Sequence, residues 1–119
     1  MIRKIIIMLL LFGILLNVSS CALLKGPIDK KTGFSNQLEQ TANYIRSEDW
    51  EKARTNLDTL QKTWKKIKPL LQVDIDHDYV NSIEGDFIKL VGYIETNEKP
   101  DSLATILLIQ DTWENIGSL

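Results

Sequence analysis

The densest group of side chains that could bind a metal ion comprises Asp74, Asp76, His77 and Asp78. Acids at alternate positions are typical of a calcium loop, which also needs a glycine at its sixth position and a bidentate glutamate at its twelfth. Counted from Asp74, these positions hold Tyr79 and Gly85, so the loop lacks both features. We interpret the segment as a helix start, with Asp76 as the cap and acids in the first turn. We therefore expect no metal site.

Residues for nucleophilic catalysis are equally scarce. The chain has one histidine, His77, and one cysteine, Cys21, and no serine lies in a Gly-x-Ser-x-Gly turn. A lone histidine without a cysteine partner does not indicate zinc, and the sequence has no glycine-rich phosphate loop. We therefore expect no enzyme, no catalytic residue and no cofactor.

The first 20 residues have the features of an export signal. Arg3 and Lys4 form a positive start, and an apolar run follows from Ile5 to Leu16, interrupted by Gly13 alone. This run of 12 residues is shorter than the roughly 20 that a helix needs to cross a bilayer. The pattern predicts a signal peptide over residues 1–20.

The segment that follows, Val18-Ser19-Ser20-Cys21, resembles the lipobox of bacterial lipoproteins. The resemblance implies that Cys21 receives a diacylglycerol group, becomes the first residue after cleavage and anchors the chain in the membrane through fatty acids such as palmitate. The alternative is an uncleaved helix from Ile5 to Leu24 that spans the membrane. In both cases Arg3 and Lys4 stay cytoplasmic, which places the domain that follows on the extracytoplasmic side.

The mature chain, residues 21–119, would be one domain of 99 residues with 12 basic and 16 acidic side chains. Its net charge of −4 disfavours nucleic acid as a partner. Because the chain has no second cysteine, the domain must be held together by packing. Residues 25–72 carry a net charge of +4, and residues 73–119 a net charge of −8. We expect helices of the two parts to attract each other; alternatively, the lysines between Lys62 and Lys68 lie against anionic lipid.

Residues 21–33 contain few large apolar groups, and we interpret them as the lipidated cysteine and a tether. Beyond them, apolar residues recur at steps of three and four, which is the pattern of amphipathic helices. The first helix is expected over residues 34–46 and the second over about residues 48–68, ended by Pro69. Ser47 is expected to cap the second helix with its hydroxyl.

Two further helices follow the same apolar spacing. The core positions of the third are Val80, Ile83, Phe87, Leu90 and Ile94. A polar turn over residues 96–100 and a cap at Asp101 or Ser102 precede the fourth helix. Its core positions are Ile106, Ile109, Trp113 and Ile116, and Leu103, Leu107 and Leu108 widen its apolar surface.

The two halves of this pattern repeat with an offset of 49 residues. The matching residues are Tyr44, Ile45, Gln61, Thr63 and Trp64 in the first half and Tyr93, Ile94, Gln110, Thr112 and Trp113 in the second. Each half then forms one helical hairpin. Two hairpins with short loops predict an all-α fold, an antiparallel four-helix bundle over residues 34–119 that follows an N-terminal signal or anchor helix.

Four motifs after Phe34 match those of a known family. They are Asp49-Trp50-Glu51-Lys52-Ala53, Trp64, Ile75-Asp76-His77 and Glu114-Asn115-Ile116. Together they resemble the family known as domain of unknown function 4363. Its members are small proteins of Gram-positive, often spore-forming bacteria with an N-terminal membrane segment and a helical domain outside. The resemblance implies this architecture and location, and it implies no catalytic residues.

The outer side of the third helix carries an apolar strip. Gly85 and Gly92 lie there seven residues apart, although an exposed glycine costs a helix about 1 kcal/mol relative to alanine. Ile88 lies between them and Val91 at the edge. We expect these four residues to form a face for a partner helix or for self-association, with Leu108 of a second copy as one possible contact. The alternative is that the strip is energetically idle.

These observations favour a membrane-anchored, extracytoplasmic lipoprotein whose helical domain has a structural or adaptor role in the cell envelope. The membrane contact would be the lipid on Cys21, and the partner would be another protein or a second copy. The alternative is a module that senses or binds a small ligand in an apolar cavity between the hairpins. Trp50, Trp64 and Trp113 could line such a cavity, although their spacing favours core packing.

Overall fold

The computed structural model describes residues 1–17, 22–72 and 77–116, and these residues form six helices and no strand. The helices are α1 (Ile2–Asn17), α2 (Ala22–Thr32), α3 (Phe34–Arg46), α4 (Trp50–Leu71), α5 (His77–Glu95) and α6 (Lys99–Asn115). The fold is therefore all-α, as the sequence predicts. Cys21, the predicted lipidation site, and the acids Asp74 and Asp76 lie outside the described residues.

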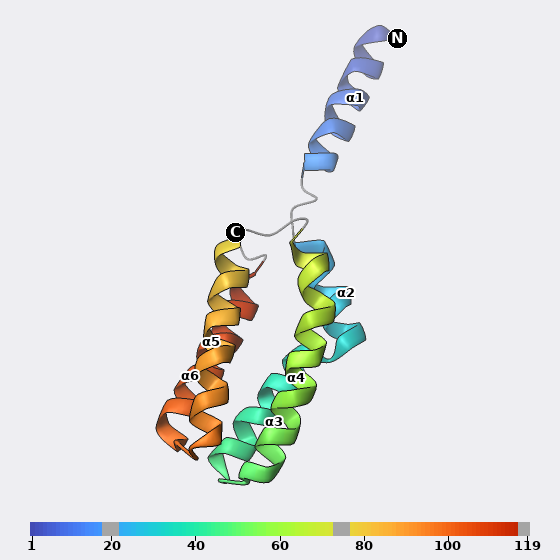
Figure 1. Cartoon of the computed structure of the whole chain (residues 1–119). Helices are drawn as coiled ribbons and strands as arrows, with labels where there is room; N and C mark the ends of the chain where they lie inside the picture. The colour runs from blue at the N-terminus through green and yellow to red at the C-terminus, as the bar shows by residue number, and fades with distance from the viewer. Residues whose placement is uncertain (18–21, 73–76, 117–119) are drawn as a thin grey trace.

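The helices from α2 onward lie together, whereas α1 projects away from them (Figure 1). The molecule consequently measures 71 × 23 × 21 Å along its principal axes. α1 covers most of the predicted signal peptide. Among the described residues, no helix combines the length and the apolar character that crossing a membrane requires.

Four helices enclose the core. α3 packs against α4 and α6, and α5 packs against α4 and α6, while the diagonal pairs do not meet at the backbone level over the described residues. We refer to α3 and α4 as the first helix pair, and to α5 and α6 as the second. Within each pair the helices run side by side in opposite directions (Figure 1).

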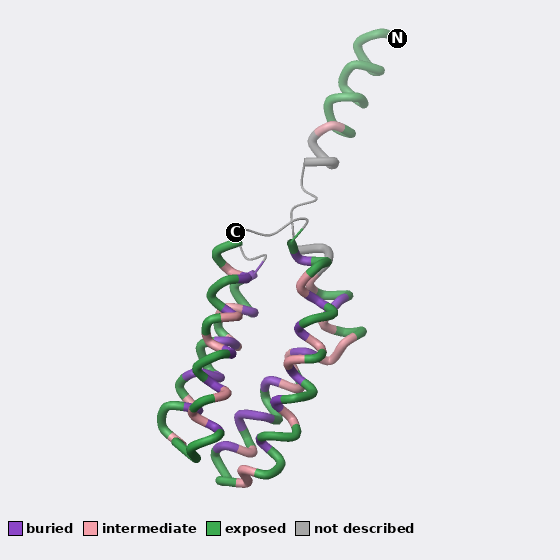
Figure 2. Tube along the Cα trace, in the orientation of Figure 1, coloured by how far each residue is buried: buried purple, intermediate pink, exposed green. Residues whose placement is uncertain are grey.

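The buried residues recur along one side of each packed helix (Figure 2). All the core positions predicted for the third helix are buried in α5, and those predicted for the fourth are buried in α6 and at Ile116 directly after it. In α3 the buried residues recur at the same steps, and they are Phe34, Leu38, Thr41, Ala42 and Ile45. At the centre, the Phe34 ring lies 4.7 Å from that of Trp113 and 5.8 Å from that of Trp64. Trp50, in contrast, is only half-buried at the start of α4. Each fully buried large apolar side chain stabilises the fold by about 1.5–3 kcal/mol.

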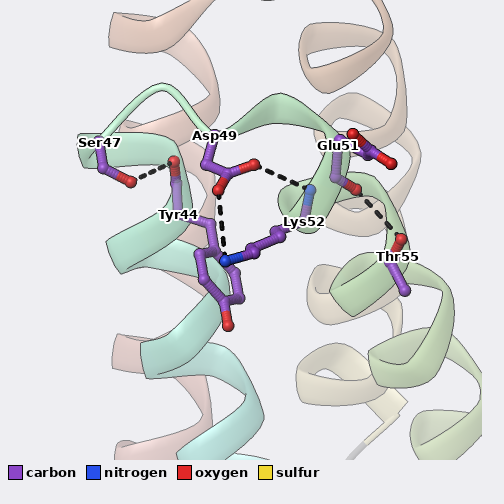
Figure 3. Close-up of polar contacts among 6 residues, drawn as sticks. All are labelled: Tyr44, Ser47, Asp49, Glu51, Lys52 and Thr55. Carbon is purple, nitrogen blue, oxygen red and sulfur yellow. Dashed lines mark hydrogen bonds and ion pairs between the residues drawn. The ribbon is translucent and has the colours of Figure 1, made fainter.

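The cap of α4 differs from the sequence prediction. The side chain of Asp49 accepts a hydrogen bond from the Lys52 backbone N–H at 3.2 Å, so Asp49 is the cap (Figure 3). The Ser47 hydroxyl instead donates to the Tyr44 carbonyl. The reason is that Glu48 adopts a left-handed conformation with φ of 55°, which ends α3 and moves the start of the next helix two residues along.

The predicted end of the second helix at Lys68 is also wrong, because α4 continues through Pro69 to Leu71. Pro69 cannot donate to the carbonyl of Lys65, but both residues are exposed, so water can reach that carbonyl. Leu71 is 1% exposed. Burial of this side chain favours one more helical turn, and the Gln72 N–H closes it on the Lys68 carbonyl at 3.0 Å.

The last helix begins earlier than predicted. Glu98 occupies the cap position in place of Asp101 or Ser102, so α6 starts at Lys99, and Pro100 lies in its first turn. A proline is tolerated there, because the first N–H groups of a helix have no partner within the helix. Ser102 is fully buried, and its hydroxyl donates to the Glu98 carbonyl at 2.6 Å instead of capping the helix.

The segment interpreted as a tether contains helix α2. Ile28 is buried in the core, and α2 packs on α3 and α4. The Asp29 carboxylate accepts hydrogen bonds from the backbone N–H of Ser35 at 2.8 Å and from its hydroxyl at 2.6 Å. These bonds tie α2 to the start of α3 across Gly33, whose left-handed φ of 69° favours glycine. The prediction missed this helix because residues 25–32 contain a single large apolar residue, Ile28, which is too few for an amphipathic pattern.

Candidate functional site

The predicted 49-residue repeat extends to the backbone of the two helix turns. Glu48 and Asn97, which are 49 residues apart, both adopt left-handed φ angles, of 55° and 56°. In the first turn the Asp49 N–H donates to the Tyr44 carbonyl at 2.9 Å, and in the second the corresponding bond measures 2.8 Å. Both turns are thus Schellman motifs, in which a left-handed residue ends the first helix.

The repeat also relates the hydrogen bonds of two buried tryptophans. Trp64 of the first pair donates its indole N–H to Glu84 of the second at 3.4 Å. Trp113 of the second pair donates to Ser35 of the first at 2.9 Å. Both the two tryptophans and their two acceptors are 49 residues apart. Each helix pair therefore contributes the same bond to the other, which relates the pairs by an approximate two-fold axis.

This two-fold relation produces two equivalent surface grooves. The α4–α5 groove has a volume of about 380 Å³ and is lined by Gln61, Trp64, Lys65, Glu84, Phe87, Ile88 and Val91. The α3–α6 groove has a volume of about 100 Å³ and is lined by Ser35, Leu38, Glu39, Gln110, Trp113 and Glu114. Each residue of the second set lies 49 positions from a residue of the first. The larger groove is the candidate site.

Two substitutions between the repeats explain why the grooves differ. Ile88 on the rim of the α4–α5 groove corresponds to Glu39, and Val91 on its floor corresponds to Ala42, whose smaller side chain lets α3 approach α6 more closely. Helix α2 also covers part of the smaller groove. The ammonium group of Lys25 lies 5.7 Å from the centre of the Trp113 ring and donates to the Glu114 carbonyl at 3.0 Å. The α3–α6 groove is therefore partly filled.

The predicted partner face forms one edge of the α4–α5 groove. Ile88 is 77% exposed, and Val91 is half-buried against the core. Both line the groove, whereas Gly85 and Gly92 are exposed on the outer side of α5. No heavy atom lies within 4 Å of where a Cβ would stand at either glycine. The surface of α5 beside the groove therefore carries no protruding side chains at these two positions.

The sequence prediction missed the opposite edge of the groove. This edge comes from α4, which contributes Gln61, Trp64 and Lys65. The sequence predicts α4 as a helix but does not indicate which helix lies beside it. The available signal was the repeat, because Gln61 and Trp64 are among the residues that match the second half. That match shows that the positions are equivalent, but it does not show which helix α4 adjoins.

An ion pair closes one end of the candidate site. The Lys68 ammonium lies 2.5 Å from a carboxylate oxygen of Glu84, the same oxygen that Trp64 approaches. The Lys68 hydrogen bond lowers the pKa of Glu84 from its ordinary value, and the Trp64 bond adds to this effect, while burial opposes it. Glu84 is thus held ionised, which suits a structural ion pair and not a general acid.

A second hollow of about 430 Å³ lies beside the first helix turn. It is lined by Tyr44, Asp49, Glu51, Lys52, Thr55 and Asn56. Two of its charged groups contact each other, because Lys52 lies 3.7 Å from the Asp49 carboxylate, and Lys52 also lies 5.8 Å from the centre of the Tyr44 ring (Figure 3). The close-up shows these side chains turned toward one another. This arrangement stabilises the turn and has few groups left for a ligand.

The acidic segment at the start of α5 is partly described. His77 and Asp78 are exposed in the first turn of that helix. Within residues 1–17, 22–72 and 77–116, no three histidine, cysteine or acidic side chains are grouped closely enough to hold a metal ion. Asp74 and Asp76 fall outside these ranges, so the absence of a metal site there stays a prediction.

The described residues thus form an all-helical structure with two related helix pairs and an open apolar groove between α4 and α5. Residues 28–119 match the family model described as "Domain of unknown function (DUF4363)". The chain belongs to this family, which confirms the resemblance found in its sequence. No curated protein and no solved structure matches the chain significantly.

Proposed function

We propose that the protein is a membrane-anchored extracytoplasmic lipoprotein whose helical domain is not an enzyme and has a structural or adaptor role in the cell envelope. The apolar N-terminal segment and the lipobox-like sequence before Cys21 support the location. In this proposal the fatty acids on Cys21 hold the chain in the membrane, and residues 22–119 lie on the extracytoplasmic side. The domain then acts by binding another protein near the membrane surface.

Helices α3 to α6 form, in this proposal, an antiparallel four-helix bundle of two hairpins. The contacts of each helix with its two neighbours support it, as do the continuous apolar seams. The short turns at Glu48 and Asn97 support the hairpins, because each reverses the chain with a single left-handed residue. A rigid bundle would hold the groove in one shape for a partner.

The observation that carries the adaptor role is the asymmetry between the two grooves. The α3–α6 groove is small and has Glu39 at its rim, whereas the α4–α5 groove is open and has Ile88 at the same position. The Ile88 side chain is 77% exposed, and covering so apolar a side chain with a partner lowers the free energy of the system. Trp64 and Phe87 beneath it provide aromatic surface of the kind found at the centres of interfaces. We infer that the α4–α5 groove binds a helix of a partner protein.

The test combines Gly85→Lys with Ile88→Glu in the full-length chain. Both positions are exposed, so the domain should stay folded and helical while it loses association with its partner in cross-linking or pull-down experiments. Asn36→Lys is the matched control, because it places the same lysine and glutamate on the equivalent face beside Glu39. Unchanged association in the double variant would refute the groove as the binding site.

The volume of the α4–α5 groove favours a second function, the binding or sensing of a small apolar ligand. About 380 Å³ lies within the range of small-molecule sites, and Trp64 and Phe87 supply an aromatic lining. A ligand that binds only the folded chain raises its melting temperature. A screen of apolar small molecules that gives such a rise, and loses it in Ile88→Glu, would favour this function over the adaptor role.

The membrane anchor is tested separately. Cells that express the full-length chain should incorporate a labelled fatty acid into it, and Cys21→Ala should abolish both the label and signal cleavage. The matched control is Ser20→Ala, which keeps the cysteine and introduces a residue common at that position of a lipobox. A wild-type chain that is unlabelled and still begins at Met1 would leave the uncleaved membrane helix as the anchor.

A further inference from the structure

The protein has a second exposed apolar surface on its last helix. Leu107 and Leu108 of α6 are 41% and 54% exposed, and Ala104 is exposed one turn before them. Residues at this spacing lie on one side of a helix. The acids Asp101 and Asp111 are exposed at either end of the group. We call Asp101, Ala104, Leu107, Leu108 and Asp111 the α6 strip.

The charges beside the α4–α5 groove are opposite to those of the α6 strip. Lys65 lines the groove and is exposed. Its ammonium group has no carboxylate within 4 Å among the described residues, whereas Lys62 already pairs with Asp58 at 2.8 Å. Asp101 and Asp111 likewise have no cation within that distance in the described part of the chain. The two surfaces therefore match in both apolar character and charge.

The two surfaces cannot meet within one molecule. α6 packs on α3 and α5, and it does not contact α4 over the described residues. The side chains of the α6 strip are exposed and thus turned away from the core, while the groove opens between α4 and α5. Contact between them requires two copies of the chain.

We propose that the occupant of the α4–α5 groove is the α6 strip of a second copy of this protein. Leu107 and Leu108 would cover Ile88, and the acids of the strip would face Lys65. The open surface at Gly85 and Gly92 would let the backbone of the incoming helix approach closely. This inference rests on the proposed function, because it names the partner of the same groove.

Such a contact is head-to-tail, since it joins two different surfaces. A pair joined in this way would still offer a free groove on one copy and a free α6 strip on the other. Contacts of this kind produce rings if the rotation closes and open chains if it does not. Copies held in one membrane by their N-terminal segments would then form a lateral assembly, which fits a structural role in the envelope.

The experiment is site-specific cross-linking between two differently tagged full-length chains expressed in the same cells. One chain carries Ile88→Cys and the other Leu108→Cys, and a short bismaleimide is added to intact cells or membranes. We expect a cross-linked species that contains both tags. The matched control replaces Ile88→Cys by Glu39→Cys, the equivalent position of the smaller groove, and should give at least tenfold less product. Chains with Cys21 alone show the background.

A charge exchange tests the same contact independently. Lys65→Glu in the chain with Ile88→Cys should lower the yield of the cross-linked species several-fold, because it places a negative charge opposite the acids of the α6 strip. Asp111→Lys in the chain with Leu108→Cys should restore the yield. Failure of this second change to restore it would refute the pairing of these two surfaces.

The outcomes separate this inference from the proposed function. A cross-link between two Ile88→Cys chains, without one to Leu108→Cys, would mean that two grooves face each other and would overturn the proposal. No cross-link between copies, together with a different protein that is lost from pull-downs in the Gly85→Lys, Ile88→Glu variant, would overturn self-association but keep the adaptor role. Neither cross-link nor partner would overturn both.

Discussion

Trp64 and Trp113 occupy equivalent positions but donate to different acceptors. Trp113 donates to the neutral hydroxyl of Ser35, whereas Trp64 donates to the carboxylate of Glu84, which also pairs with Lys68. The second arrangement places a charge at the end of the open groove. That charge makes one end of the candidate site sensitive to pH, while the α3–α6 groove has no carboxylate at the equivalent position.

The pH dependence of this ion pair follows from the direction in which the pKa of Glu84 is shifted. The pKa of Glu84 in the folded chain lies below its ordinary value of 4.5, so the folded state releases this proton more readily than the unfolded state. The stabilisation is therefore fully present above about pH 4.5 and is lost as the pH falls through the lower folded pKa. We expect Glu84→Gln to destabilise the chain at neutral pH by at most about 1 kcal/mol, since the pair is partly exposed.

Thermal denaturation of the wild type and of Glu84→Gln over a series of pH values checks this prediction. The difference between their melting temperatures should shrink toward zero below pH 4.5, where the wild-type carboxyl also becomes protonated. Glu95→Gln on the same helix is the control, because Glu95 is exposed and has no ion pair within the described residues. A difference that stays constant with pH would show that the ion pair does not stabilise the fold.

At the scale of single helices, the turns at Glu48 and Asn97 are the points where the backbone is strained. A residue other than glycine costs roughly 1–2 kcal/mol in the left-handed region, and asparagine tolerates it better than glutamate. Glu48→Gly should therefore raise the stability by about 0.5–1 kcal/mol. Within the described part of the chain, the ion pair of Glu48 is with Lys99 at 3.9 Å; it is exposed and contributes little.

Asn97→Gly serves as the comparison for this prediction. The Asn97 side chain accepts a hydrogen bond from Arg54 at 2.5 Å, which joins the turn of the second helix pair to α4. Glycine would relieve less strain here and would remove that bond, so the variant should be neutral or destabilised. Equal stabilisation by both glycines, measured by denaturant unfolding, would show that the Arg54 contact contributes nothing.

Helix α2 provides a second prediction at this scale, because its packing distinguishes it from a tether. Among the α2 side chains that the structure describes, residues 25–32, Ile28 is the buried large apolar one, and its truncation should leave a cavity against α3 and α4. We expect Ile28→Ala to destabilise the chain by about 2 kcal/mol, as measured by denaturant unfolding. Ile88→Ala makes the same truncation at an exposed site and should change the stability by less than about 0.5 kcal/mol. Equal losses of stability in the two variants would show that Ile28 does not hold α2 against α3 and α4.

For the whole molecule, the two-fold relation explains why a single groove stays open. Two equivalent helix pairs produce two equivalent grooves, and the one between α3 and α6 is narrowed by Ala42 and covered at Trp113 by Lys25 of α2. The helix that precedes the first pair has no counterpart among the described residues before the second. The described residues thus combine internal symmetry with two grooves of unequal size.

The response to metal ions is a prediction about the link between the two helix pairs. Residues 74–78 contain acids at alternate positions but lack the glycine and the glutamate of a calcium loop. Addition of calcium or zinc should therefore leave the melting temperature of the chain unchanged, because an ion that does not prefer the folded state does not stabilise it. Magnesium serves as the ionic-strength control. A rise of several degrees with calcium alone would establish a metal site between the pairs.

The sequence alone determined the helical fold class, the family and most of the core. Apolar residues at steps of three and four predicted the buried sides of α3, α5 and α6, because this spacing is a property of the single helix and needs no knowledge of its neighbours. The offset of 49 residues predicted the equivalence of the pairs for the same reason. Ile88 and Val91 could also be identified, as apolar residues on or beside the outward face of a predicted helix.

The tertiary structure decided which surfaces lie side by side. Trp64, Lys65 and Ile88 line one groove only because α4 lies beside α5. The spacing of residues along the sequence does not indicate which helices are neighbours. The same is true of α2, which packs on α3 and α4 with Ile28 in the core, and of α4, which passes Pro69 because burial of Leu71 outweighs the local preference to stop. Periodicity follows from the geometry of one helix, whereas burial and exposure depend on residues that are distant along the chain.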